Sequence, residues 1–311
     1  MAPIIFPHGN AFVESKVRCP HDRAPGQTLP LGLVSDNARI RLKSTEAAPP
    51  IHCRQDCDWQ AIMLPSYSMA NKFYEPGEQR AFRVQDLFAT IAPRYDLVND
   101  LQSFGLHRYW KKYLIRLAQV RPGERALDLC CGTGDVAFIL AGRGARVVGL
   151  DFSAPMLAVA RKRSRSRTTP LASSISPQFL CGDAMKIPFS DGSFDIVTIA
   201  YGLRNLASFE DGLREMWRVA RPGGRLVVLD FGKPDNAFWR WLYFGYLRRL
   251  VPLLGWAFCG DSQTHAYILE SLQNYPAQHG VTAALRGLPC SDTRMISLLG
   301  GIMTINYGEK I

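Results

Sequence analysis

The stretch from residue 126 to residue 151 places the strongest constraint on how this chain can fold. Ala126 to Leu129 is a short apolar run, typical of a buried parallel strand. Gly132-Thr-Gly134 follows, and glycine there permits a sharp turn and the close approach of a ligand to the backbone. Val136 to Leu140 predicts an apolar helix, and Arg146 to Leu150 predicts a second strand that ends at Asp151. The carboxylate can accept hydrogen bonds from ribose hydroxyls, so the unit predicts a site for a nucleoside-containing cofactor.

The same alternation of strand and helix continues along the chain. A helix is predicted to begin after Ser153, its N-cap residue, with Pro155 in the first turn. Further strands are predicted at residues 178–181, 196–200 and 226–230, helices at 80–91, 108–117 and 211–219, and a β-hairpin at 294–307 with a Gly300-Gly301 turn. This order predicts an α/β fold with a doubly wound, mostly parallel sheet. Ligands of such sheets bind beyond the carboxyl ends of the strands.

Composition and charge exclude several classes of protein. The net charge of +10 favours anionic partners such as a nucleotide or a membrane surface. Nucleic acid is not an expected partner, because no basic stripe is interleaved with aromatic residues. No run of about 18 uncharged apolar residues exists, which argues against a membrane-spanning helix. The eight cysteines lack the paired spacing of zinc ligands, so no metal site is predicted.

Residues 1–68 differ from the rest of the chain. They hold eight of the 20 prolines and show weak periodicity. They lack the basic and apolar regions of a secretory signal, and their six acidic residues argue against a transit peptide. We interpret them as a disordered or loosely packed extension to a domain at 69–311, or as untranslated sequence before a true start at Met69. A peptide from residues 20–60 in mass spectrometry of the native protein would exclude the late start.

Residues 238–258 combine aromatic side chains with arginines. Arg240, Arg248, Arg249 and the break at Pro252 argue against a membrane-spanning segment. A membrane interface or a channel for an apolar ligand would explain the aromatic residues. A pair of helices packed on the core would explain them equally well.

Two kinds of nucleoside cofactor fit the glycine turn. Gly132, Gly134 and Ala137 match a relaxed dinucleotide pattern, but a lone match of this kind is weak. Asp128 precedes the glycines at a spacing that lets it face the amino-acid end of S-adenosylmethionine, and Asp183 can accept a hydrogen bond from an adenine amino group. Since no second dinucleotide-binding half is visible, S-adenosylmethionine is favoured over NAD.

Four segments carry a family resemblance: residues 94–108, 127–135, 201–205 and 221–225. Together they resemble the UbiE/MenG family, the C-methyltransferases of ubiquinone and menaquinone biosynthesis. The resemblance runs from about Met69 to Ile311, and segments 94–108 and 201–205 are its most specific parts. It implies a class I methyltransferase fold with a seven-stranded sheet whose last strand is antiparallel. It also implies S-adenosylmethionine as the methyl donor and a polyprenyl hydroquinone as the acceptor.

The cofactor site is predicted from both lines of reasoning. The family's contacts carry over to Thr133, Asp151, Asp183 and Ala184, and the residues themselves add Asp128, Gly132 and Gly134. Two positions depart from the family pattern. Cys130 stands where many methyltransferases have glycine, so the backbone there must tolerate a side chain, and Ala200 stands where some relatives have a serine near the cofactor.

The catalytic residues are predicted from the chemistry of the acceptor. A hydroquinone ring carbon becomes nucleophilic when a neighbouring hydroxyl loses its proton, so the site must stabilise phenolate-like charge and align the carbon. Arg204 is predicted to stabilise that charge or to help remove the proton through water, and Asn205 to orient the ring. The electrostatic role suits arginine better, because it stays protonated. Tyr95, Asp96 and His107 are further candidates, and each could instead pack or cap a helix.

The resulting expectation is a cytoplasmic enzyme that converts demethylmenaquinol to menaquinol, with a peripheral contact to the inner face of the membrane and a homodimeric state. The main alternative acceptor is a polyprenyl benzoquinol, and another small acceptor is a further possibility. Alternatives of other classes are an NAD-dependent oxidoreductase and a non-catalytic protein that binds S-adenosylmethionine.

Overall fold

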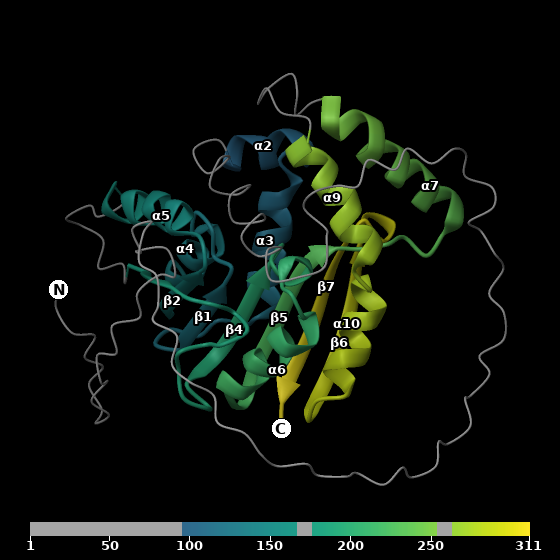
Figure 1. The fold of residues 1–311 in the computed structure, drawn as a ribbon. Helices are drawn as coiled ribbons and strands as arrows, with labels where there is room; N and C mark the ends of the chain where they lie inside the picture. The colour runs from purple at the N-terminus through teal and green to yellow at the C-terminus, as the bar shows by residue number, and fades with distance from the viewer. Residues whose placement is uncertain (1–94, 167–175, 254–262) are drawn as a thin grey trace, which may run out of the picture. The chain divides into compact units, whose positions relative to one another are not determined.

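Seven strands form one sheet in the computed structural model, which describes residues 95–166, 176–253 and 263–311 (Figure 1). Their order across the sheet is β3-β2-β1-β4-β5-β7-β6. The strands are β1 (Arg125–Leu129), β2 (Arg146–Asp151), β3 (Gln178–Cys181), β4 (Phe194–Ala200), β5 (Ala220–Phe231), β6 (Cys290–Leu298) and β7 (Met303–Lys310). The pairs from β3 to β5 are parallel, and β7 runs antiparallel to both β5 and β6. The predicted doubly wound sheet with an antiparallel last strand is therefore confirmed.

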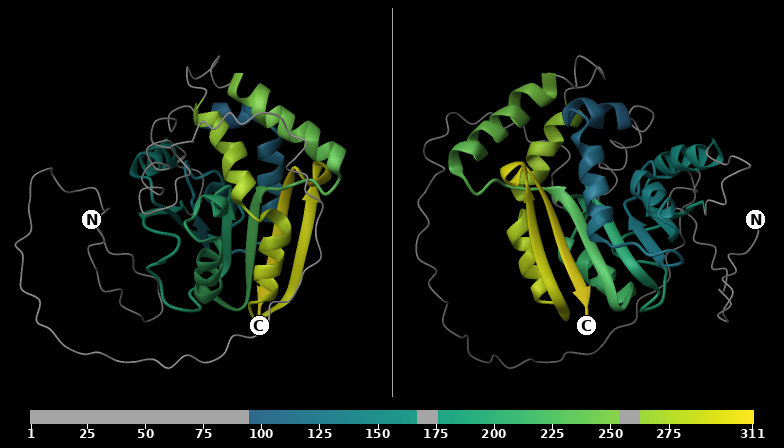
Figure 2. Two further views of the ribbon diagram at one scale, coloured as in Figure 1. Left: turned by 45° about the vertical axis from the view of Figure 1, so that its right-hand side comes forward. Right: turned by 180° about the vertical axis from the view of Figure 1, so that it is seen from behind.

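Helices cover both faces of this sheet. The α-helices of the described residues are α2 (Tyr95–Gln102), α3 (Leu106–Leu117), α4 (Asp135–Ala141), α5 (Ala154–Ser166), α6 (Phe209–Val219), α7 (Ala237–Gly245), α9 (Gln263–Asn274) and α10 (Ala277–Arg286). Helices α6 and α10 lie in front of the sheet in Figure 1, and α3 lies in front of it when the molecule is seen from behind in Figure 2. The chain thus has the layered form of a doubly wound α/β fold.

Each face of the sheet has its own apolar core. One core joins α3 and α4 to residues such as Ala126 and Ile305, and the other joins α6 and α10 to residues such as Leu127 and Val228. Ala126 and Leu127 are neighbours in β1, and successive side chains of a strand point to opposite faces. A strand that is buried on both faces needs a continuous apolar run, which explains the apolar residues predicted to form a strand from Ala126 to Leu129.

The predicted hairpin is present, and its glycines explain the turn. A short 3-10 turn, η5 (Leu299–Gly301), joins β6 to β7. Gly300 and Gly301 have φ values of 65° and 96°, a region that glycine occupies at little cost. The Cβ of an alanine at either position would also come within 3.0 Å of Trp239 or Pro234.

Helices α2, α7 and α9 lie beyond the carboxyl ends of the parallel strands, where the ligand site of this fold is expected (Figure 1). Helix α7 continues into η4 (Tyr246–Leu250), a π-helical turn. Tyr243, Leu247 and Val251 pack in the core, whereas Phe238 and Trp241 are 67% and 57% exposed. Residues 238–253 therefore combine core packing with an exposed apolar face.

Several predictions fall on residues that the structure does not describe. The extension at 1–68, the helix at 80–91 and the end of the aromatic segment, 254–258, lie outside the described residues. Conversely, no prediction covered residues 263–286, where α9 and α10 lie. Within the described ranges, no helix is long and apolar enough to cross a membrane.

Candidate active site

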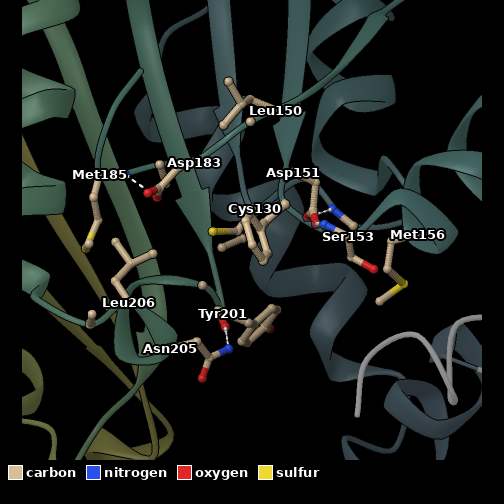
Figure 3. Close-up of a pocket in the computed structure, with 17 residues that line it drawn as sticks. Cys130, Leu150, Asp151, Ser153, Met156, Asp183, Met185, Tyr201, Asn205 and Leu206 are labelled. Carbon is tan, nitrogen blue, oxygen red and sulfur yellow. Dashed lines mark hydrogen bonds between the residues drawn. The ribbon is translucent and has the colours of Figure 1, made fainter. Parts of the chain in front are cut away.

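A cavity of about 230 Å³ opens at the carboxyl ends of β1, β2, β3 and β4 (Figure 3). Its lining includes Asp151 and Ser153 after β2, Asp183 and Ala184 after β3, and Tyr201 and Asn205 after β4. In Figure 3, Asp151 and Asp183 lie on opposite sides of Cys130. The sheet therefore gathers residues that are far apart in the sequence, as the topology predicts.

Asp151 fixes the glycine turn from the end of the second strand. Its two carboxylate oxygens accept hydrogen bonds from the backbone N–H groups of Gly132 (2.7 Å) and Ser153 (2.8 Å). Burial raises the pKa of Asp151, and these N–H donors oppose that rise. The predicted carboxylate thus lies in the cavity wall and holds the loop that forms the neighbouring wall.

Two residues of the cavity wall adopt a backbone conformation that favours glycine. Cys130 and Tyr201, at the ends of β1 and β4, have φ values of 49° and 61°. Position 130 thus has the conformation that glycine adopts at little cost, and Cys130 occupies it with some backbone strain. The Cys130 side chain also depends on Gly202, since the Cβ of a residue there would lie 2.4 Å from Cys130 Cβ.

The wall at the end of β3 contains Asp183 and Ala184, two predicted cofactor residues. Asp183 is exposed, and its Oδ1 accepts a hydrogen bond from the N–H of Met185 at 2.8 Å. Ala184 is 4% exposed. Both residues line the cavity.

Ser153, on the opposite side of the cavity, does not have the helix-capping role that was predicted for it. The Ser153 hydroxyl is buried and makes no hydrogen bond to the described residues, so it does not cap α5 by its side chain.

A second, smaller cavity of about 30 Å³ adjoins the first at the glycine turn. The two share Cys130, Gly132, Ala200 and Tyr201 in their walls. The smaller cavity adds a polar set, Lys111, Asp128, Thr133 and Asp135. The predicted cofactor residues therefore divide between two adjoining cavities.

Asp128 is the most buried carboxyl group of the site, with 1% exposure. Its Oδ1 accepts a hydrogen bond from the Thr198 hydroxyl at 2.8 Å, and its Oδ2 has no partner among the described residues. Burial raises the pKa of Asp128 to about 7, against the opposing effect of Thr198. An uncharged or cation-paired Asp128 is therefore favoured near neutral pH.

A network of charges ties helix α2 to the glycine turn. Thr133 Oγ1 donates to Asp96 at 2.9 Å, and Arg163 donates to Asp96 at 3.0 Å and to Asp135 at 2.6 Å. Lys111 Nζ donates to Asp135 at 2.8 Å. Burial alone would raise the pKa of Asp135, but Lys111 and Arg163 hold it well below its usual value. Asp96 is thus a structural neighbour of the cofactor loop.

Gly134, a predicted cofactor residue, lies at the end of the glycine turn and is the N-cap residue of α4. It lies outside the residues that line either cavity. Its φ is 88°, and a Cβ there would come within 2.9 Å of Phe179. Gly134 therefore allows the close approach of the turn to Phe179 and Phe138, at the start of α4.

The predicted catalytic residues occupy unequal positions. Asn205 lines the larger cavity, with Oδ1 accepting from the Tyr267 hydroxyl at 2.8 Å and Nδ2 donating to the Tyr201 carbonyl at 3.2 Å. Arg204 is 6% exposed and lies behind that wall. Its Nη1 donates to Asp230 at 2.6 Å and to the Tyr201 carbonyl at 2.7 Å. Arg204 is thus a member of a buried ion pair.

The other candidates lie on α2 and α3. Tyr95 is the first residue of α2, and its side chain is outside the described part of the chain. His107 is 3% exposed, and its Nε2 is 2.7 Å from Asp100 Oδ1. Burial lowers the pKa of His107. Neither cavity has His107 in its lining, so the packing interpretation suits it better.

Comparison with known proteins identifies the family. The model of the ubiE/COQ5 methyltransferase family matches residues 75–310. The chain belongs to the ubiE/COQ5 methyltransferase family. It is similar to the demethylmenaquinone methyltransferase of Thermus thermophilus, with 41% identity over 226 residues that cover 72% of this chain and 100% of the relative. The ubiquinone/menaquinone biosynthesis C-methyltransferase UbiE of Azotobacter vinelandii is 39% identical over 238 residues, which cover 76% of this chain and 92% of the relative.

Solved structures agree on the fold. A SAM-dependent methyltransferase of Thermotoga maritima, a possible histamine N-methyltransferase, aligns with a TM-score of 0.52 and 16% identity over 73% of this chain and 99% of its own. Family membership confirms that the chain is a methyltransferase whose cofactor is S-adenosylmethionine.

The residues present fit that cofactor. Asp128 Oδ2 and Ser153 Oγ are buried atoms without hydrogen-bond partners among the described residues, and each lies in a residue that lines one of the cavities. Buried polar atoms of this kind are stabilised when a ligand supplies the missing partner. The walls hold four carboxyl groups and one lysine, which suits a ligand with sulfonium and ammonium charges.

Sequence reasoning missed three residues that contact the site, Lys111, Arg163 and Tyr267, and it missed the ion pair of Asp230 with Arg204. Lys111 and Arg163 belong to charged helix surfaces in the sequence, where a solvated role is the usual one. Asp230 was placed at the carboxyl edge of the sheet by strand prediction, which is the available signal for it. Tyr267 belongs to α9, for which no helix was predicted.

Proposed function

We propose that the chain methylates a ring carbon of a polyprenyl hydroquinone, with demethylmenaquinol as acceptor and menaquinol as product. The observation that carries this proposal is the 41% identity to a demethylmenaquinone methyltransferase over that relative's whole length. A benzoquinol is the second candidate acceptor. It is favoured by the 39% identity to a relative named for both ubiquinone and menaquinone biosynthesis.

The residues after β4 are best placed to receive the acceptor. Tyr201 and Asn205 line the larger cavity, and the Tyr267 hydroxyl fixes the orientation of the Asn205 amide. The reaction forms a bond from the ring carbon to the methyl group, breaks the bond from that group to sulfur, and releases the ring proton. Bound S-adenosylmethionine supplies a methyl group already activated on its sulfonium. The chain must therefore orient the ring and stabilise the charge on its oxygen.

Arg204 has an electrostatic role in this proposal. Its guanidinium stays protonated, so it cannot act as a base. Hydrogen bonds to Asp230 and to the Tyr201 carbonyl fix its position. Its centre lies 4.7 Å from the ring centroid of Phe231. From this fixed position, Arg204 stabilises negative charge on an acceptor bound against Tyr201 and Asn205, although Asp230 reduces its net field.

The test is direct methyl transfer by the purified protein. Incubation with S-adenosylmethionine and a short-chain demethylmenaquinol should give the product one methyl group heavier by mass spectrometry, and the matching oxidised quinone should give none. A parallel assay with a demethylated polyprenyl benzoquinol separates the two acceptors. Cofactor binding with no transfer to either quinol would refute the proposal and favour a different acceptor or a non-catalytic role.

We also propose that the exposed apolar face of α7 contacts an anionic membrane, where a polyprenyl substrate resides. Phe238 and Trp241 stack at 6.1 Å and are exposed on α7, and Leu250 and Leu253 are 41% and 56% exposed after it. Arg248 and Arg249, exposed between them, add positive charge. Aromatic side chains flanked by arginines suit the interface of a bilayer that contains anionic lipids.

Flotation with phosphatidylglycerol vesicles tests the membrane contact. The protein should float with these vesicles at low salt and less with phosphatidylcholine vesicles, and Trp241→Ser should reduce flotation. Ile311→Ser is the matched control, because Ile311 is 70% exposed at the opposite end of β7 (Figure 1). Equal flotation of all three proteins would assign α7 to packing alone.

A further inference from the structure

Lys111 is a buried cation at the cofactor site that the reaction has not yet used. It lies on α3, is 5% exposed, and lines the smaller cavity together with Asp128, Thr133 and Asp135. Among the described residues that line either cavity, Lys111 is the only one with a positive charge. A buried lysine requires a compensating partner, because its desolvation is costly.

Asp135 satisfies only part of the hydrogen-bonding capacity of Lys111. A lysine ammonium has three N–H donors, and the hydrogen bond that Lys111 makes within the described chain goes to Asp135 Oδ2 at 2.8 Å. The Nζ also lies 5.9 Å from the ring centroid of Tyr201, a residue common to both cavities. Two N–H donors therefore remain for a ligand.

The cofactor has one anionic group that needs such donors. Asp151 and Asp183 occupy the walls of the larger cavity, where acidic side chains suit the ribose hydroxyls and the adenine amino group. The amino-acid end of the cofactor carries an ammonium and a carboxylate. An ammonium can meet the unpaired Oδ2 of Asp128, but a carboxylate is repelled by the ionised acidic side chains of the walls.

From this arrangement we infer that Lys111 binds the α-carboxylate of S-adenosylmethionine in the smaller cavity. The cavity of about 30 Å³ is large enough for a small polar group, since one water needs roughly half that volume. It meets the larger cavity at Cys130, Gly132, Ala200 and Tyr201, as a single extended ligand requires. Lys111 is thus a positioning residue that sets where the sulfonium end of the ligand lies.

A competing explanation is that Lys111 only joins α3 to α4 through Asp135. The two explanations predict different effects of substitutions at Lys111 and at Asp135. If the ion pair is purely structural, Lys111→Met and Asp135→Asn break the same contact and have similar effects. If Lys111 binds a carboxylate, Lys111→Met removes the binding group, whereas Asp135→Asn removes a competing negative charge.

The experiment compares two ligands by calorimetry: S-adenosylhomocysteine and its decarboxylated analogue, S-adenosylthiopropylamine. Removing the carboxylate should weaken binding to the unaltered protein by roughly 10- to 100-fold, the effect of one hydrogen bond to a charged group. In Lys111→Met, the two ligands should differ by less than about threefold. Asp135→Asn should keep or increase the discrimination, and Lys112→Met, at the exposed neighbouring lysine, should leave it unchanged.

Two results would overturn the inference. One is a Lys111→Met variant that still distinguishes the ligands as well as the unaltered protein does. The other is an Asp135→Asn variant that loses the discrimination, which would assign Lys111 to the ion pair alone and applies even if Lys111→Met does not fold. The inference rests on the cofactor and not on the quinol, so it remains testable if the proposed methyl acceptor is wrong.

Discussion

The buried carboxyl group of Asp128 leads to a prediction about stability and pH. Asp128 is 1% exposed, Thr198 is its hydrogen-bond partner, and burial raises its pKa to about 7 from an ordinary value of 3.8. In the unfolded chain, the carboxyl group ionises above its ordinary pKa, whereas in the folded chain it keeps its proton to near neutral pH. The stability that it contributes is present below pH 3.8 and is lost as the pH rises toward 7.

The magnitude follows from the two pKa values. Compared with an aspartate that stays protonated in both states, Asp128 lowers the free energy of unfolding by ~1.7 kcal/mol at pH 5 and by ~4.3 kcal/mol at pH 8. Asp128→Asn removes the ionisation and keeps an oxygen that can accept from the Thr198 hydroxyl. The free energy of unfolding of this variant, relative to the unaltered protein, should therefore increase by roughly 2.5 kcal/mol between pH 5 and pH 8.

Urea unfolding at several pH values, without cofactor, measures this difference. The difference curve should rise from pH 5 and level off just above pH 7, where the folded protein also ionises. Asp211→Asn on α6, at an exposed carboxylate, is the control, and its difference should stay within about 0.5 kcal/mol. A flat curve for Asp128→Asn would show that Asp128 is already charged in the folded protein, and a falling curve would reverse the sign of the argument.

Three further substitutions test the geometry of the site. Gly202→Ala places a Cβ 2.4 Å from Cys130 Cβ and should lower the free energy of unfolding by about 1–3 kcal/mol. Cys130→Gly in the double variant should restore most of this loss, and chemical denaturation that shows no restoration would contradict the contact. Arg204→Ala leaves buried Asp230 without its cationic partner and should lower the free energy of unfolding by about 3–5 kcal/mol. The loss should be smaller if Asp230→Asn is added, and a loss under about 1 kcal/mol would show that the ion pair does not form in solution. Asp151→Ala should weaken S-adenosylhomocysteine binding at least tenfold in calorimetry, and unchanged affinity would remove Asp151 from the cofactor site.

Because Arg204 is part of a buried ion pair, a test of its role in catalysis must also measure folding. If Arg204 has the proposed electrostatic role, Arg204→Ala should lower turnover at saturating cofactor, but the ion pair with Asp230 makes loss of folding a competing cause. Arg204→Lys keeps the charge and loses the planar group that bonds both Asp230 and the Tyr201 carbonyl. Turnover at saturating cofactor, measured together with unfolding, therefore separates the electrostatic role from the structural one.

The fold could be predicted because its signals are local. A parallel strand buried on both faces leaves an apolar run in the sequence, and the glycine turn and Asp151 mark its end. The hairpin at the end of the chain is marked in the same way by Gly300 and Gly301. Helices α9 and α10 lack an equally clear signal, because their packing surface is created by η4, α6, β6 and β7 and exists only after folding.

The sequence indicates residues of the cavity walls where they lie in a strand or follow its end. Asp151, Asp183 and Asn205 line the larger cavity because the topology brings the carboxyl ends of parallel strands to one edge. Lys111 and Arg163 lie on helices, and nothing in their spacing shows that they point toward the glycine turn. The role of Arg204 depends on Asp230, 26 residues later, and only the structure shows that they form a pair.

The contacts of the glycine turn connect helices α2 and α3 to the loop that lines both cavities. Asp96 on α2 accepts a hydrogen bond from the Thr133 hydroxyl, and Lys111 on α3 bonds Asp135, so the turn is held from two helices. Asp151 holds the same turn from β2 through the N–H of Gly132. A change in α2 or α3 must therefore move the loop that receives the cofactor.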